Sequence, residues 1–370
     1  MNVEYKKITT FDKINRNAYH MAFDLLSNFV SLFFKDRLEE IEDFRLEASD
    51  IQSEQLFNLL REAEDTEWGK KYDFKTIFSY QDFRERLPIQ RSKDLRSYLE
   101  RMKSGEANIL WPGLPKGIIP TFSYGQIPIS EQALSEIFFQ GINDSYALYL
   151  HQNPESKLFG GYMASIGNGV RDSFMYDLFR LLQGNEPFIN SLFNIPRRIV
   201  NGNSQKNCSN LILKEIKGQK VSCFKGSPEC LQALLEKAKN NNKNTELSQL
   251  WPDAEVLFHR TPATTSQLIE AKKTLPQVLT YQTTYCSPEG LFGIQDNLND
   301  QSYLLMLDLS TFYEFYPTDG TENQCIPLED INLDMDYQMI ITNCSGLWRY
   351  CSEGPKLRFV SRNPYRFILS

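Results

Sequence analysis

Cysteine and histidine, the side chains that most often act as nucleophiles or metal ligands, are scattered through this sequence. Histidines stand at positions 20, 151 and 259, and cysteines at 208, 223, 230, 286, 325, 344 and 351. A thiol nucleophile needs a neighbouring base, and a metal site needs several ligands brought together. Cys286 has no histidine near it in the sequence. Unless the fold brings distant residues together, neither a thiol nucleophile nor a metal site of this kind is predicted.

Small and hydroxyl-bearing residues gather between Thr121 and Ser130. Backbone N–H groups in such a segment can hold a phosphate, whose charge must also be paired by a cation. Ser123 and Gly125 are the candidate phosphate contacts. The segment contains no basic side chain, however, and Lys116 lies on the far side of Gly117–Pro120. A plain turn is therefore the favoured interpretation, with a phosphate contact as the alternative.

The elements that would position these residues change in type along the chain. Residues 1–105 are predicted to be helical, with Leu56, Leu59, Leu60 and Ala63 at helical spacing after Asp50 and Ser53. Residues 106–277 mix helices and strands, and residues 278–370 are β-rich. The predicted fold class is α/β, built as one large domain rather than as separate units.

Composition narrows the class of partner. Forty basic and forty-seven acidic residues give a net charge of −7, which does not favour binding to nucleic acid. The apolar stretch Phe23–Phe34 is too short and too polar to span a membrane, so a helix docked on its own protein is expected there. No export signal is evident, and the odd number of cysteines favours reduced thiols, so we expect a cytoplasmic protein.

Seven short stretches, in this order, resemble one known family. They are Gly69–Phe74, Asp82–Arg84 with Leu87–Ile89, Gly105–Gly113, Trp251–Pro252, Tyr285–Gly290, Tyr313–Pro317 and the segment from Gly346 to Arg366. Together they resemble the Gretchen Hagen (auxin-responsive promoter) family of acyl-acid amido synthetases, within the acyl-adenylate-forming superfamily. The resemblance implies a large multi-sheet N-terminal domain with a helical N-terminal region, followed in complete members by a small C-terminal domain that we expect to be absent here.

The resemblance also implies a reaction and a set of roles. ATP and a carboxylic acid would form an acyl-adenylate, which an amine or amino acid then attacks. Tyr285 would contact adenine, Glu289 would bind Mg²⁺, and Glu353 stands near the place of the family's ribose-binding carboxylate. The alternatives are that Tyr285 is a strand aromatic in the core and Glu289 a solvated loop carboxylate.

Tyr285, Glu289 and Gly290 keep the family pattern, but the sequence departs from it at other places around the site. Residues are missing from the phosphate loop before Ile127, and Arg260 and Thr261 stand where a glycine pair admits the base. Pro288 replaces a hydroxyl residue, and Ser352–Pro355 replaces a Gly-Asp pair. Losing one charge-assisted contact costs about 1.5–3 kcal/mol, so several losses together should weaken nucleotide binding severely.

Three hypotheses follow for the function. The leading one is a degenerate synthetase-like protein that does not adenylate by itself and retains binding of a small carboxylic acid or a protein partner. The second is an active ATP- and Mg²⁺-dependent ligase whose C-terminal domain comes from another chain. The third is a truncated gene product without activity. Trp348, Arg349 and Tyr350 are expected to serve sheet packing, with an ion pair at Arg349, under any of them.

Overall fold

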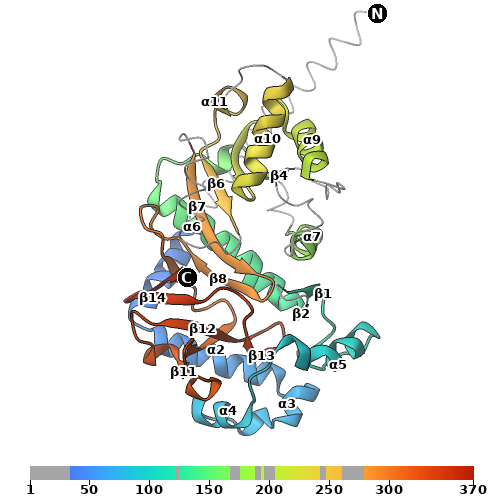
Figure 1. Cartoon of the computed structure of the whole chain (residues 1–370), viewed down its shortest axis with the longest axis vertical. Coiled ribbons are helices and arrows are strands. Elements are labelled where there is room, and N and C mark those ends of the chain that lie inside the picture. Colours follow the sequence, from blue (N-terminus) through green and yellow to red (C-terminus); the bar gives the residue numbers. More distant parts are fainter. Residues whose placement is uncertain are drawn as a thin grey trace, which may run out of the picture.

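The computed structural model describes residues 34–121, 125–166, 176–187, 193–195, 205–241, 247–260 and 279–370 of the chain. Ser123, Thr261 and the Phe23–Phe33 part of the apolar stretch lie outside these ranges. Within them the molecule is an elongated α/β body, with the N-terminal helices and the C-terminal strands sharing its lower half (Figure 1).

Helices dominate the first described segment. Residues 34–42 are helical, and the next elements are η1 (Asp43–Arg45), α2 (Ala48–Ala63), α3 (Glu67–Lys71), η2 (Phe74–Thr76), α4 (Tyr80–Arg86) and α5 (Ser92–Lys103). Asp50 and Ser53, after which the predicted helical spacing begins, already lie inside α2, because this helix begins at Ala48. Thr66 instead starts α3 by accepting a hydrogen bond from the Gly69 N–H.

The middle of the chain alternates between helices and strands. Its elements are β1 (Gly117–Pro120), β2 (Gln126–Ile129), the π-helix η3 (Ala133–Phe139), α6 (Gln140–Gln152), η4 (Leu158–Gly160), β3 (Tyr162–Ser165), α7 (Tyr176–Gly184), β4 (Asn194–Ile195), α9 (Gln205–Ile216), β5 (Val221–Lys225), α10 (Pro228–Asn241), α11 (Leu247–Leu250) and β6 (Val256–His259). Ser130 and Ser227 stand at the predicted helix starts, where each hydroxyl accepts a backbone N–H.

The last described segment is almost entirely β-structure. It contains β7 (Thr280–Ser287), β8 (Gly290–Ile294), β9 (Tyr303–Leu305), β10 (Thr311–Pro317), η5 (Glu322–Gln324), β11 (Ile326–Pro327), η6 (Leu328–Asp330), β12 (Asp336–Asn343), β13 (Leu347–Cys351), β14 (Leu357–Arg362) and β15 (Tyr365–Leu369). The predicted run from Tyr303 to Phe315 is two strands, separated by residues 306–310.

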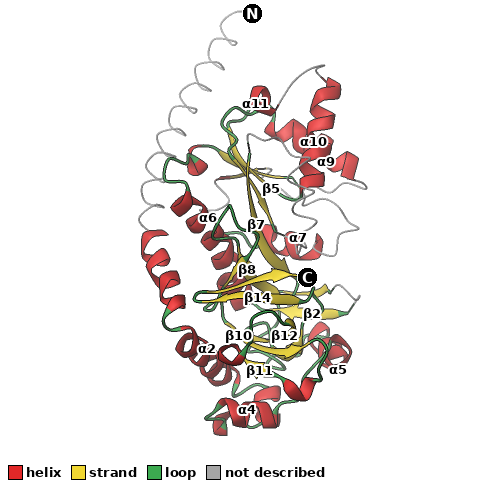
Figure 2. Cartoon of the chain, turned by 60° about the vertical axis from the view of Figure 1, so that its left-hand side comes forward, coloured by secondary structure: helices red, strands yellow, loops and turns green. Residues whose placement is uncertain are grey.

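A 13-stranded sheet joins the two halves in the order β11-β10-β12-β14-β15-β9-β8-β7-β6-β5-β3-β4, with β13 paired to β12. Strands β4, β3, β5, β6 and β7 pair in parallel, whereas β7 to β12 pair antiparallel. Figure 2 shows α2 and α6 on one side of the strands and α7, α9 and α10 on the other. Strand β7 is buried along nearly its whole length, as expected of a strand in a sheet that is covered on both faces.

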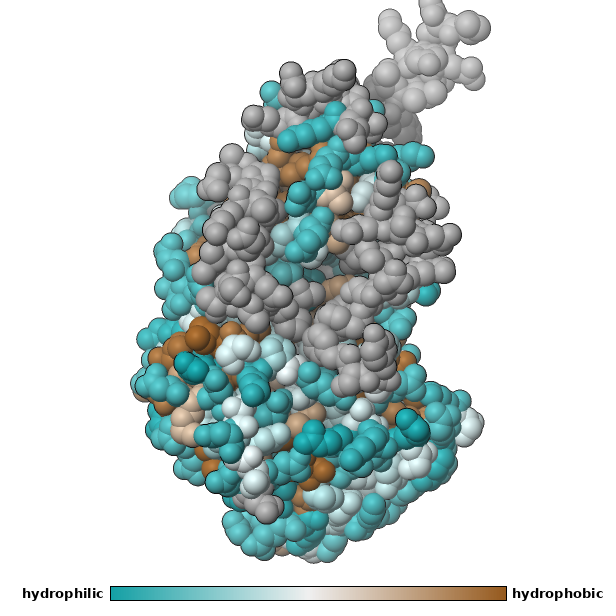
Figure 3. Space-filling model, viewed as in Figure 1, coloured by the Kyte–Doolittle hydropathy of each residue, from teal (hydrophilic) through white to brown (hydrophobic). Residues whose placement is uncertain are grey.

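Apolar side chains from all three segments form one continuous core. Figure 3 shows a mainly hydrophilic surface over the lower half of the molecule, in keeping with the many charged residues of the chain. No helix within the described residues is long and apolar enough to cross a membrane. The six cysteines whose surroundings are described are free and buried.

An ion pair between Arg349 and Glu314 lies inside this core and joins the helical region to the sheet. The Arg349 Nε and Nη2 atoms each lie 2.9 Å from a Glu314 carboxylate oxygen. The Nη1 group donates to the carbonyl oxygens of Arg84 and Leu87 at the end of α4. Both charged side chains are at most 5% exposed. The expected ion pair at Arg349 is therefore confirmed, with Glu314 as its partner.

Removing one partner of this ion pair should be costly. The substitution Arg349→Met leaves the Glu314 carboxylate buried and unpaired, so we expect a loss of about 3–5 kcal/mol in the free energy of unfolding. Urea unfolding measures this loss. The matched control is Arg358→Met, because Arg358 binds Asp336 with 43% and 29% of the two side chains exposed. That variant should lose at most about 1 kcal/mol, and equal losses would contradict the assigned role.

Candidate functional site

The predicted residues Tyr285 and Glu289 lie on one β-hairpin. Tyr285 is near the end of β7, Glu289 is in the turn, and Gly290 begins β8 opposite Ser287. The turn is fixed from a third strand, since the Asn343 side chain at the end of β12 donates to the Glu289 carbonyl oxygen at 2.9 Å. The hairpin therefore carries a carboxylate on a rigid support.

Glu289 is only 1% exposed, so the alternative of a solvated loop carboxylate is wrong. The Ser287 hydroxyl donates to one carboxylate oxygen and accepts the Glu289 N–H at 3.1 Å. The other oxygen, Oε1, has no hydrogen-bond partner among the described residues. Burial raises the pKa of Glu289 to about 7; the Ser287 hydrogen bond opposes this rise and the Glu353 carboxylate adds to it. A buried carboxylate with a free oxygen is suited to hold a proton or a cation.

Tyr285 is fully buried, and its ring packs against Phe292, Tyr303 and Phe367. The ring of Tyr285 is therefore a core aromatic of the strand, which was the alternative to a contact with adenine. Its hydroxyl lies under the turn that follows β13, because a Cβ added to Gly354 would be 2.3 Å from the Tyr285 oxygen. Only glycine fits over this hydroxyl, so the turn closes directly onto Tyr285.

Glu353 extends from that turn toward the hairpin. The buried Tyr350 hydroxyl donates to the Glu353 Oε1 atom at 3.2 Å, and Ser352 fixes the turn by accepting the Gly354 N–H. Strand β13 is itself held by Gln90, which bonds to the backbone of Arg349 and Cys351. The carboxylates of Glu289 and Glu353 act electrostatically on each other, and each raises the pKa of the Tyr350 hydroxyl in addition to burial.

Gly125 lies just before β2 and packs against Ser92 and Thr121. A Cβ at this position would lie 2.4 Å from the Ser92 side chain, at the start of α5, and 2.9 Å from the Thr121 hydroxyl. Ser92 in turn reaches the Tyr350 hydroxyl. Lys116 does not enter the loop, because its ammonium pairs with Glu131 at 3.2 Å. Gly125 is thus linked to Glu353 through Ser92 and Tyr350.

The structure therefore gathers Gly125, Tyr285, Glu289 and Glu353 into one site, whereas Ser123 lies outside the described residues. Sequence reasoning missed Ser92 and Tyr350, which connect the four. Ser92 was recognised only as a helix start, and Tyr350 only as a strand residue. Neither the residue types of Ser92 and Tyr350 nor their spacing in the sequence distinguishes them from ordinary structural residues.

Cys286 faces the other side of β7. Alternate residues of a strand point to opposite faces, and Gln282 on the Cys286 face bonds to Ser145 of α6. Burial raises the pKa of the Cys286 thiol to about 12, so the thiolate needed of a nucleophile is disfavoured. His259 is buried too: its Nδ1 lies 3.1 Å from the Tyr281 hydroxyl, and burial lowers its pKa to about 4. The described residues contain no cluster of three potential metal ligands.

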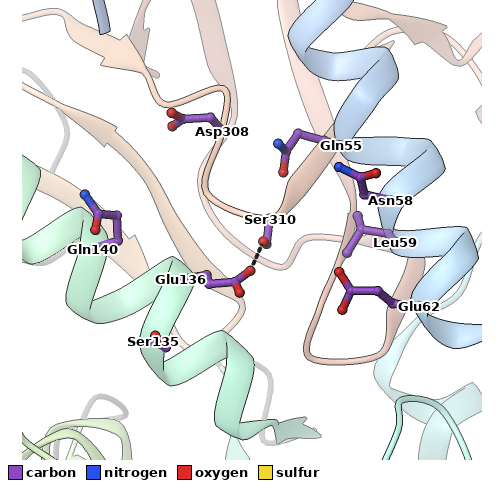
Figure 4. Close-up of a pocket in the computed structure, with 9 residues that line it drawn as sticks. All are labelled: Gln55, Asn58, Leu59, Glu62, Ser135, Glu136, Gln140, Asp308 and Ser310. Carbon is purple, nitrogen blue, oxygen red and sulfur yellow. Dashed lines mark hydrogen bonds between the residues drawn. The ribbon is translucent and has the colours of Figure 1, made fainter. Parts of the chain in front are cut away.

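A separate polar pocket of about 340 Å³ lies between α2, η3, the start of α6 and the loop before β10 (Figure 4). Its lining includes the carboxylates of Glu62, Glu136 and Asp308. Glu136 accepts a hydrogen bond from Ser310, and Asp308 is bound by Arg37. None of the residues predicted from the sequence to bind a nucleotide lines this pocket.

Two family models match the chain. The GH3 family N-terminal domain matches residues 37–158, and the GH3 family central domain matches residues 304–362. The second match covers β9 to β14 and includes Glu353. Both matches fall in the parts of the chain that carry the sequence resemblance, so the chain is similar to the GH3 family in these two regions.

Known relatives are acyl acid amido synthetases and similar ligases. The 4-substituted benzoates-glutamate ligase GH3.12 of Arabidopsis thaliana is 30% identical over 36% of this chain and 26% of its own length. The jasmonoyl–L-amino acid synthetase JAR4 of Nicotiana attenuata is 21% identical over 85% of this chain and 67% of its own length. The match to GH3.12 thus spans about a quarter of that protein.

Solved structures show the same fold. A GH3.15 acyl acid amido synthetase superposes with a TM-score of 0.69 at 17% identity, over 90% of this chain and 70% of that one. A second GH3.15 structure, in complex with 2,4-DB, gives a TM-score of 0.70 at 18% identity, over 91% of this chain and 70% of that one. The predicted α/β fold class is confirmed, and the fold is that of these two solved structures.

The raised pKa of Glu289 gives a testable pH dependence. The unfolded carboxyl titrates near its usual pKa of 4.5 and the folded one near 7, so between these values the folded state holds more protons. Stability should then fall as pH rises through this window, by up to about 3 kcal/mol relative to Glu289→Gln. Urea unfolding of both proteins from pH 4.5 to 8 measures the difference. A difference that stays constant with pH would contradict the burial of an ionisable Glu289.

Proposed function

We propose that this chain is a synthetase-like member of its family that binds a small carboxylic acid but does not form an acyl-adenylate by itself. One observation carries the proposal: the turn Ser352–Pro355 lies over Tyr285 and beside Glu289, the two residues that the resemblance assigns to adenine and Mg²⁺. A nucleotide would have to displace this turn and restore charge to a carboxylate whose pKa is near 7.

The phosphate side of the site supports the same proposal. A triphosphate needs cations when it is desolvated. Lys116 is paired with Glu131 outside the loop, and the two acidic residues Glu289 and Glu353 repel a polyanion. A bound Mg²⁺ would offset this repulsion, and the free Oε1 atom of Glu289 is the atom that would hold it.

Binding of a carboxylic acid is proposed from the relatives and from the retained fold. GH3.15 was solved with 2,4-DB, and the name of GH3.12 gives 4-substituted benzoates as its substrates. We further propose that residues 1–370 act as one adenylation-type N-terminal domain. A reducing cytoplasm is the proposed location, because the described cysteines are free.

The second candidate function is an active ATP-dependent ligase that joins a carboxylic acid to an amine or amino acid. The convergence of Gly125, Tyr285, Glu289 and Glu353 favours it, since these residues come from segments far apart in the sequence. On this alternative the Ser352–Pro355 turn moves when the nucleotide binds.

Exchange of labelled pyrophosphate into ATP distinguishes the two functions. The chain is incubated with Mg²⁺ and a panel of carboxylic acids, with a GH3.15 acyl acid amido synthetase as the positive control. We expect no acid-dependent exchange above background, because the Ser352–Pro355 turn lies over Tyr285 and no phosphate-binding cation is found beside Gly125 among the described residues. Exchange at a rate comparable to the control would refute the proposal and establish the ligase. Calorimetry with ATP-Mg²⁺ at millimolar concentration shows whether the loss lies in binding or in chemistry.

A further inference from the structure

Arg260 lies on the α6 side of the sheet, across β7 from the site described above. It is the first residue after β6, where the family has a glycine pair. Its Nη2 group donates to the Tyr146 hydroxyl of α6 at 2.8 Å, and its guanidinium carbon is 5.7 Å from the Tyr146 ring centroid. The planar group is therefore held in one orientation against α6.

One edge of this guanidinium is buried without a partner. The Arg260 Nε atom has no solvent exposure and no acceptor among the described residues. Five other arginines among the described residues place the same two nitrogens, Nε and Nη2, on a single carboxylate; the pairs are Arg37–Asp144, Arg101–Glu106, Arg349–Glu314, Arg358–Asp336 and Arg366–Asp296. Burying such a donor unpaired is unfavourable. An acceptor from outside the described residues is therefore indicated.

Charged groups of both signs lie around Arg260. Lys225, at the end of β5, is 8% exposed and donates to Asn194, which itself donates to Glu186. Lys225 and Arg260 act electrostatically on both Glu186 and Cys223, while Glu255 also acts on Cys223 and Glu289 acts together with Arg260 on Cys286. Because these charges do not select the acceptor, the choice of a carboxylate rests on the two-point pairing that the other arginines make through Nε and Nη2.

The position is also where α/β sheets bind ligands. Lys225 and Arg260 stand at or just beyond the carboxyl ends of β5 and β6, which pair in parallel. We propose that the Nε edge of Arg260 binds the carboxylate of a small organic acid between α6 and the carboxyl ends of these strands. The ligand class rests on the proposed function, but the binding requires no adenylation.

Binding of sodium benzoate, phenylacetate and acetate to the full chain tests this role. Isothermal titration calorimetry is run at constant ionic strength, with inorganic phosphate as the competing anion. We expect at least one of the three acids to bind and phosphate to bind more weakly. Arg260→Met should weaken the acid at least tenfold, and Arg260→Lys should do the same because an ammonium lacks the Nε edge.

Arg180→Met is the matched control. Arg180 also lies over a tyrosine ring, at 5.5 Å from the centroid of Tyr176, but its own side chain is exposed. This variant should bind the acid as the wild type does. Circular dichroism confirms that each variant is folded, and Arg260→Lys serves if Arg260→Met does not fold.

Three results would overturn the assignment: no binding of any of the acids, preferred binding of phosphate, or unchanged acid binding in a folded Arg260 variant. If acid binding is unchanged in a folded Arg260 variant, the protein still binds the acid but Arg260 is not the residue that binds it. Pyrophosphate exchange, by contrast, would refute the absence of adenylation without affecting the Arg260 result.

Discussion

The buried ion pair between Arg349 and Glu314 is the interaction on which the arrangement of the site depends. Arg349 has a left-handed backbone, with φ of 45°, and its N–H donates to the Thr342 hydroxyl. Its guanidinium holds the end of α4, and its carbonyl oxygen holds Gln90. Both segments that Arg349 joins continue into the site: β13 leads to Glu353, and the segment of Gln90 leads to Ser92. Losing Arg349 would leave the Glu314 charge unpaired in the core, and the contact of Arg349 with the end of α4 would also be lost.

Strand β7 divides the functional residues into two groups with opposite electrostatics. On one face, Glu289 and Glu353 create an acidic, closed site in which burial favours a protonated carboxyl. On the other, the cations of Arg260 and Lys225 lie near the Glu186 carboxyl and the buried Cys223 thiol. A strand buried on both faces keeps the two environments apart, since its alternate side chains cannot exchange sides without a register shift. The chain thus separates a place for a cation or proton from a place for an anion.

Much of the fold could be predicted from local patterns. Strand β13 occupies the predicted residues, and the helices at Ser79, Ser130 and Ser227 begin where a hydroxyl accepts a backbone N–H. Errors arose where local signals were weak or competed. Asp50 and Ser53 have capping side chains but lie within α2, and the π-helix after Ser130 has no signature in side-chain spacing. Strand β8 was not predicted as a separate strand, because its glycines at 290 and 293 have low strand propensity.

The sequence by itself determined the α/β fold class and the resemblance to one family, and it proposed Gly125, Tyr285, Glu289 and Glu353 as site residues, because ordered motifs and the types of their side chains are local properties of the chain. Only the tertiary structure decided that Glu289 is buried, that Gly354 closes over Tyr285, and that Arg260 lies against Tyr146 with a free Nε edge. The physical reason is that desolvation and hydrogen-bond partners depend on segments far apart in the sequence: 69 residues separate Tyr285 from Gly354, and 114 separate Tyr146 from Arg260. No spacing rule within one segment can specify them.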